Sequence, residues 1–162
     1  MSKSSVLLDT IFFLRFLNDE DPLFNNADGY FRYFLHNEIA MMISTISIAE
    51  YCVGGDIRNL PLRNLQIIPF NIAHAKRTGE FAKIAFEEKK RGDLKVGNRN
   101  IIPNDTKLFA QADCEKLVKF YLSSDTESLK IFNLLKQVSS PKFQFIDLNI
   151  PFNETFGMLD LI

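Results

Sequence analysis

Four acidic side chains stand where predicted strands end and predicted helices begin. They are Asp9, Glu50, Asp105 and Asp125. Because the carboxyl ends of parallel strands meet at one edge of a sheet, acids at these junctions can converge although they are far apart in sequence. Such like charges repel one another unless a cation lies among them, and carboxylate oxygens suit Mg²⁺ or Mn²⁺. A divalent ion held there could activate a water molecule for attack on a phosphodiester.

Each of these acids, taken alone, could serve only to cap a helix. Asp9, Asp105 and Asp125 stand at predicted helix starts, where Asp is a favoured residue. Glu50 follows Ser47 by three residues, which is the spacing of a capping box. The joint placement of the four acids therefore carries the metal-site interpretation. We expect Asp9 and Asp105 to be direct ligands, while Glu50 and Asp125 would act directly or through water.

Short apolar runs alternate with amphipathic segments along the chain. The apolar runs predict strands at 6–8, 40–43, 65–69, 117–122 and 143–147. Helical periodicity predicts helices at about 11–17, 25–37, 44–53, 72–90, 105–115 and 125–138. Strands that alternate with helices indicate a mostly parallel sheet covered on both faces. The fold class that we expect is α/β, in three α/β/α layers, with a sheet of four or five strands.

Length, composition and charge limit the class of protein. The chain has 162 residues, 46% of them hydrophobic, which is enough for the single domain that we expect over residues 1–162. A net charge of −1 gives no general attraction to nucleic acid or to a membrane surface. The two cysteines, Cys52 and Cys114, are too few for a disulfide scaffold and lack metal-ligand spacing. No signal-peptide shape or apolar run of roughly 20 residues occurs, so we expect a cytoplasmic protein with no membrane span.

Three short motifs occur in a definite order. A hydrophobic strand is followed by Asp9-Thr10, the run Ile-Ser-Thr-Ile-Ser-Ile-Ala leads to Glu50, and an Asn-Asp pair ends at Asp105. A later strand is followed by Asp125. Over nearly the whole chain this order resembles the PIN-domain ribonucleases, and most of all the VapC-type toxins of bacterial toxin–antitoxin pairs.

The resemblance implies an endoribonuclease that depends on Mg²⁺ or Mn²⁺ and cleaves single-stranded RNA. It also implies a homodimer and a small antitoxin partner. The implied catalytic and metal-binding acids are Asp9, Glu50, Asp105 and Asp125. Thr10 and Ser47 match supporting hydroxyl positions. Ile11 departs from the pattern, because members of the family often have a polar residue there.

Basic and aromatic residues gather in two other regions. The tentative RNA-binding residues, on the long predicted helix and the segment after it, are Lys89, Lys90, Arg91, Lys95 and Arg99. They form either a solvated face or a strip that contacts phosphates, and the strip would make RNA binding salt-dependent. The aromatic residues between Tyr30 and Phe34 exceed what one helix face can bury. We expect most of them in the core and the remainder in an exposed patch that binds a partner helix or a second copy.

Two alternatives stay open at this point. A PIN-like domain could bind or process RNA outside a toxin pair. A non-enzymatic, receiver-like α/β module also gathers acids at strand ends, but it needs an acceptor Asp where Pro69-Phe70-Asn71 stands. Nucleotide-binding and nucleophile-elbow motifs are absent from the sequence. His36 and His74 lack partners at metal-ligand or triad spacing, so we expect surface or packing histidines.

Overall fold

One sheet of five parallel strands forms the centre of the computed structural model, which describes residues 3–92 and 101–157, without the side chains of residues 101–103. The strands are β1 (Ser5–Leu8), β2 (Ala40–Ser44), β3 (Leu65–Ile68), β4 (Val118–Ser123) and β5 (Gln144–Asp147). Their order is β3-β2-β1-β4-β5, and every neighbouring pair is parallel. The predicted parallel α/β sheet is therefore confirmed, with five strands.

Seven α-helices connect and cover the strands in the described part of the chain. They are α1 (Thr10–Phe16), α2 (Phe24–His36), α3 (Thr45–Tyr51), α4 (Ile72–Arg91), α5 (Ile101–Cys114), α6 (Thr126–Val138) and α7 (Phe152–Thr155). The long helix α4 ends at Gly92, whose φ of 82° lies in the left-handed region that glycine adopts without strain. No helix among the described residues is long and apolar enough to cross a membrane.

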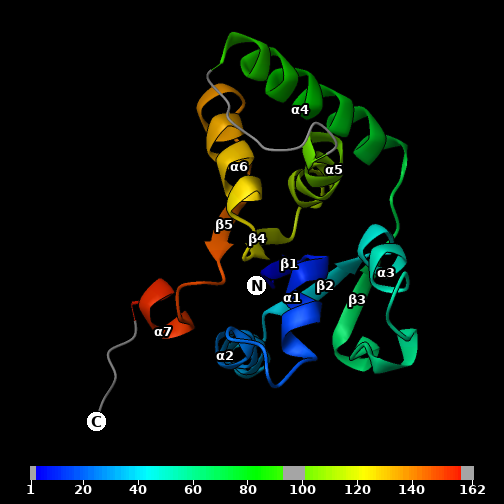
Figure 1. The fold of residues 1–162 in the computed structure, drawn as a ribbon, viewed down its shortest axis with the longest axis vertical. Helices are drawn as coiled ribbons and strands as arrows, with labels where there is room; N and C mark the ends of the chain where they lie inside the picture. Colours follow the sequence, from blue (N-terminus) through cyan, green and yellow to red (C-terminus); the bar gives the residue numbers. More distant parts are fainter. Residues whose placement is uncertain (1–2, 93–100, 158–162) are drawn as a thin grey trace.

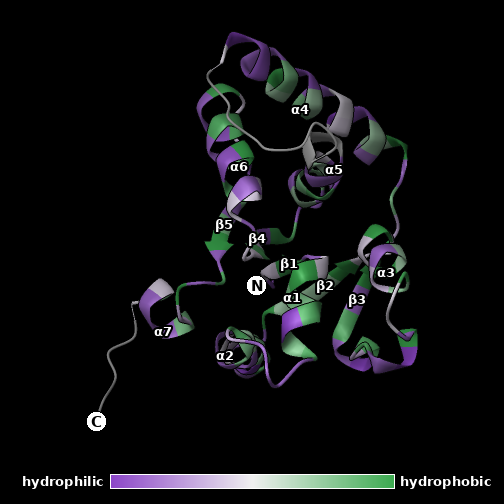
Figure 2. Cartoon of the chain, in the orientation of Figure 1, coloured by the Kyte–Doolittle hydropathy of each residue, from purple (hydrophilic) through white to green (hydrophobic). Residues whose placement is uncertain are grey.

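The two faces of the sheet carry separate hydrophobic clusters. Leu7 and Tyr121 belong to the cluster that includes residues of α4, α5 and α6. Leu8 and Leu122, their neighbours along the strands, belong to the cluster that includes residues of α1 and α2. Figure 1 shows these two groups of helices on opposite sides of the sheet, and Figure 2 shows hydrophobic strands beside an α4 of mixed hydropathy. This is the predicted three-layer α/β/α arrangement.

The aromatic residues of α2 are covered by a later segment of the same chain. Tyr33 stacks on Phe156 with ring centroids 4.3 Å apart, and Tyr30 lies edge-on to Phe152 at 6.3 Å. The Tyr30 hydroxyl also donates to the carbonyl oxygen of Ile150 at 2.7 Å. The prediction of an exposed aromatic patch on this helix is wrong, because residues around α7 pack on it.

Two polar contacts tie α4 to the C-terminal end of α5 and the residue after it. His74 is buried and completes a capping box with Asn71, and its Nε2 lies 2.9 Å from Glu115 Oε1. Arg77 Nε donates to the buried Asp113 Oδ2 at 2.8 Å. His74 is thus a packing histidine, as predicted.

Candidate active site

From β1 the chain adds β2 and β3 on one side of the sheet, and then adds β4 and β5 on the other side. The switch point of the sheet therefore lies between β1 and β4. These strands are neighbours, with Leu8 paired to Leu122, and Asp9 N donates to the Leu122 carbonyl at 3.4 Å. Asp9 directly follows β1, and Asp125 follows β4 by two residues. Open α/β sheets bind ligands in the crevice outside the strand carboxyl ends at such a switch point.

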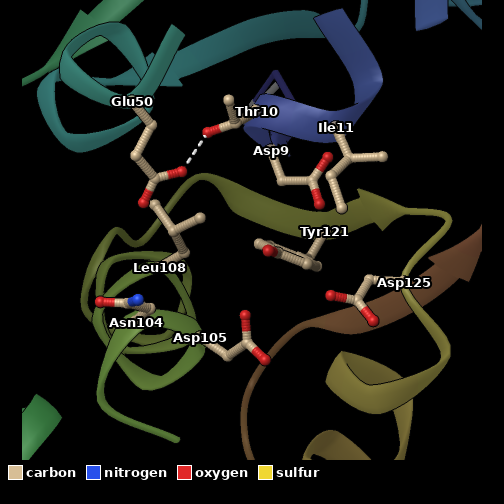
Figure 3. A pocket seen from close by; sticks show the side chains of 9 residues that line it. All are labelled: Asp9, Thr10, Ile11, Glu50, Asn104, Asp105, Leu108, Tyr121 and Asp125. Atoms are coloured by element: carbon tan, nitrogen blue, oxygen red, sulfur yellow. Dashed lines mark hydrogen bonds between the residues drawn. The ribbon is translucent and has the colours of Figure 1, made fainter. Parts of the chain in front are cut away.

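A pocket of about 230 Å³ opens at this point, and we call it the acidic pocket. The residues that line it are Asp9, Thr10, Ile11, Glu50, Asn104, Asp105, Leu108, Tyr121 and Asp125 (Figure 3). All four acids named from the sequence are among them. Among the described residues no Lys, Arg or His lines it. The pocket therefore has an excess of negative charge when its carboxyls are ionised.

Asp9 both caps a helix and faces the acidic pocket. Its Oδ1 accepts a hydrogen bond from Phe12 N at 2.8 Å, at the start of α1. Burial is the main cause that raises the pKa of Asp9 to about 7; the charges of Asp125 and Glu50 add to this effect, and hydrogen bonding to Ser123 and Phe12 opposes it. The capping explanation is correct here, but it does not exclude the site.

Asp105 does not cap a helix. Helix α5 begins at Ile101, so Asp105 is its fifth residue and not its start as predicted. Its Oδ2 is buried and makes no hydrogen bond to any described residue. Burial is the main cause that raises the pKa of Asp105 to about 8, followed by the charges of Asp125 and Asp9. No capping role accounts for this carboxylate.

Glu50 lies at the exposed rim of the acidic pocket. Its Oε2 accepts a hydrogen bond of 2.6 Å from Thr10 Oγ1, as Figure 3 shows. The cap of α3 is Ser44, whose Oγ accepts from Ile46 N, so the capping box with Ser47 does not form. Ser47 is buried, makes no hydrogen bond to a described residue and does not line the pocket. Of the two predicted supporting hydroxyls, only Thr10 reaches the acids.

Asp125 caps α6 and also lines the acidic pocket. Its Oδ1 accepts from Glu127 N at 2.9 Å and from Ser128 N at 3.4 Å. Arg15 fixes the preceding residue, because its Nε donates to Ser124 Oγ at 2.9 Å. The backbone and a neighbouring helix therefore hold Asp125 in place.

The donor set is compatible with a hydrated divalent ion. Asp105 offers a buried oxygen without a partner among the described residues, and no described Lys, Arg or His lines the pocket to neutralise its carboxylates. No group of three or more His, Cys, Asp or Glu among the described residues is gathered closely enough to enclose one ion. Mg²⁺ does not need such a group, because it keeps several waters and takes one or two carboxylates.

Some residues that line the pocket could not be predicted from the sequence, and some residues that were predicted for the site lie elsewhere. Tyr121 and Leu108 line the pocket. The alternation along β4 places Tyr121 on the α5 and α6 face, but it does not predict that the ring reaches the sheet edge. The tentative RNA-binding residues Lys89, Lys90 and Arg91 form the last turn of α4, and none lines the pocket. Lys95 and Arg99 lie outside the described residues.

Comparisons with solved structures identify the fold. A chain of the DNA-bound VapBC complex from Salmonella typhimurium matches with a TM-score of 0.55 and 19% identity, over 90% of this chain and 98% of that chain. A chain of VapBC2 from Rickettsia felis, bound to a promoter DNA fragment, matches with a TM-score of 0.54 and 18% identity, over 88% and 98%. The sequence matches no family model and no curated protein significantly. The resemblance to VapC-type PIN domains is thus confirmed at the level of the fold.

Proposed function

We propose that the protein is an endoribonuclease that uses Mg²⁺ or Mn²⁺ to cleave single-stranded RNA in the acidic pocket. The observation that supports this most strongly is the convergence of four carboxylates at the switch point of a parallel sheet. No Lys, Arg or His is among the described residues that line the pocket with them. The proposed catalytic and metal-binding residues are Asp9, Glu50, Asp105 and Asp125. We take residues 1–162 to act as one domain, because a single sheet carries both hydrophobic clusters.

The four acids have different environments and therefore different proposed roles. A bound divalent ion supplies an activated water and relieves negative charge on the phosphoryl group. Asp9 and Asp105 have the raised pKa values, so ion binding would release their protons, and we propose them as the direct ligands. Glu50, held by Thr10 at the exposed rim, and Asp125, held by the backbone of α6, would bind through water or orient the nucleophile.

RNA must reach the pocket against the charge of its carboxylates. Its phosphates would be repelled there unless an ion is bound, so part of the affinity must come from basic residues outside the pocket. The last turn of α4, with Lys89, Lys90 and Arg91, is the described part of the proposed strip. Lys95 and Arg99 follow it in sequence.

The solved structures with this fold also suggest the partners. Both are chains of VapBC complexes, so by analogy of fold we propose a small antitoxin protein as partner, and a homodimer. The aromatic face of α2 is not available for either contact, because α7 covers it. Light scattering of the purified protein and mass spectrometry of proteins that co-purify from its native cell test this. A strict monomer without a small protein would remove the toxin setting and leave the nuclease.

The function itself is tested with the wild-type protein and a labelled single-stranded RNA. Cleavage should require Mg²⁺ or Mn²⁺, stop on addition of EDTA and return when the metal is restored. Binding of RNA without cleavage under these conditions would favour a PIN-like RNA-binding domain. The receiver-like alternative is disfavoured by topology, because receivers have the strand order 2-1-3-4-5 whereas this sheet has the order β3-β2-β1-β4-β5.

A further inference from the structure

Tyr121 is a buried tyrosine at the floor of the acidic pocket. Its ring packs against Phe109, Phe145 and Phe143, with centroids 5.0, 5.5 and 6.1 Å away. Only 1% of Tyr121 is exposed, yet it lines the pocket. Figure 3 shows it between Asp9 on one side and Asp105 on the other. The aromatic contacts therefore fix a phenol among carboxylates.

Ser128 places a second hydroxyl beside the same groups. It lies in the first turn of α6, is 1% exposed, and its Oγ makes no hydrogen bond to any described residue. Its hydroxyl is close enough to lower the pKa of Asp105 and the pKa of Tyr121. A buried hydroxyl without a partner costs free energy, so its retention calls for a reason.

Asp105 has a buried carboxylate oxygen that lacks a donor in the described part of the chain. Asp9 Oδ1, by contrast, accepts a hydrogen bond from Phe12 N at 2.8 Å, which lowers the pKa of Asp9. Asp105 Oδ2 has no donor among the described residues. An ionised carboxylate is an acceptor only, whereas tyrosine and serine hydroxyls can donate. The Ser128 hydroxyl, which has no assigned acceptor among the described residues, and the Asp105 oxygen, which has no donor there, thus both lie near the Tyr121 phenol.

We propose that Tyr121 and Ser128 are positioning residues, which donate hydrogen bonds to the Asp105 carboxylate and orient it when the pocket binds a divalent ion. The proposal rests on the proposed function, because it needs an ion in the pocket. Carboxylates that bind metals are themselves held by hydrogen bonds, and loss of such a partner typically lowers metal affinity by about 10- to 100-fold. Tyr121 would act through Asp105 and does not itself touch the ion or the RNA.

The test measures Mn²⁺ affinity by calorimetry, without RNA. Tyr121→Phe keeps the ring and removes only the hydroxyl, so its melting temperature should stay near that of the wild type while the Kd for Mn²⁺ rises about tenfold or more. Ser128→Ala should weaken binding in the same direction. Tyr33→Phe, on α2 and outside the pocket, is the matched control and should bind Mn²⁺ as the wild type does.

A double-mutant cycle distinguishes positioning from a general effect on the fold. If Tyr121 acts through Asp105, then Tyr121→Phe should add no further loss in an Asp105→Asn background. Additive losses, or wild-type Mn²⁺ affinity in both Tyr121→Phe and Ser128→Ala, would overturn the proposal. If Tyr121→Phe lowers the melting temperature, the proposal is tested instead with Ser128→Ala, alone and combined with Asp105→Asn. A wild-type protein that binds no Mn²⁺ would instead overturn the proposed function.

Discussion

Thr10 Oγ1 donates a hydrogen bond of 2.6 Å to Glu50 Oε2, and this contact joins two helices whose residues are 40 positions apart. Thr10 opens α1 directly after Asp9, and Glu50 lies in the second turn of α3. Glu50 is otherwise exposed, so Thr10 is what holds its carboxylate toward the pocket. The hydrogen bond links the rim of the pocket to its buried centre.

Glu50→Gln should lower metal-dependent RNA cleavage by at least about tenfold and leave the melting temperature unchanged. The reason is that Ser44, and not Glu50, caps α3, so the substitution removes a charge without removing a cap. Thr10→Val should give a smaller loss, because Glu50 stays present but loses its orientation. Cleavage rates and thermal melts of both variants check this, and a wild-type rate in Glu50→Gln would leave Glu50 without a role in the chemistry.

The stability of the metal-free protein should fall as pH rises. Burial raises the pKa of Asp9 to about 7 and that of Asp105 to about 8. Between about pH 4, where unfolded Asp ionises, and pH 8 the folded protein therefore holds protons that the unfolded chain has released. The stability that this adds is complete below about pH 4 and is lost as pH rises through these two pKa values.

Urea unfolding in EDTA at pH 5 and pH 8 measures this effect. The amide side chain that Asp9→Asn introduces cannot titrate and still caps α1. Between pH 5 and pH 8 the free energy of unfolding of this variant should therefore fall by roughly 2–3 kcal/mol less than that of the wild type. Addition of Mn²⁺ at pH 8 should restore the stability that the metal-free wild type loses between pH 5 and pH 8. An equal pH dependence in the wild type and in Asp9→Asn would show that Asp9 is ionised throughout.

Gly29→Ala should destabilise the contact between α2 and α7. A Cβ on Gly29 would lie 2.8 Å from Phe152 Cδ1, so the ring must shift away from its place on α2. Overpacking of this kind typically costs about 1–3 kcal/mol. Chemical unfolding measures the loss, while RNA cleavage below the melting transition should be unchanged, since neither residue lines the pocket. Unchanged stability would mean that Phe152 contributes little to the packing.

The strands and the convergence of the acids could be predicted because they depend on local signals. Apolar runs mark the strands, and a parallel sheet brings the residues after Leu8 and Ser123 to one edge. The start of α5 could not be placed, because Pro103 in its first turn resembles a helix boundary in sequence. The packing of the segment around α7 on α2 could not be predicted for another reason. The contact of Tyr33 with Phe156 joins distant segments, and periodicity within one helix carries no information about it.

Replacement of Lys89, Lys90 and Arg91 by alanine should weaken RNA binding and make it less dependent on salt. Each lost phosphate contact reduces the slope of log affinity against log salt by about 0.7 for a single strand. The turnover rate at saturating RNA should stay the same, because none of the three lines the pocket. The exposed Lys119, Lys136 and Lys142, changed together to alanine, remove the same charge and serve as control. Equal effects of the two triple variants would show that only net charge matters.

The most direct measurement is the single-turnover cleavage rate of a single-stranded RNA in Mn²⁺ for the wild type, Asp9→Asn and Asp105→Asn. Asp28→Asn serves as matched control, because Asp28 forms a surface ion pair with Arg32 and does not line the pocket. We predict loss of cleavage in Asp9→Asn and Asp105→Asn, with both proteins folded, and a wild-type rate in Asp28→Asn. Wild-type cleavage by Asp9→Asn and Asp105→Asn would contradict catalysis in the acidic pocket.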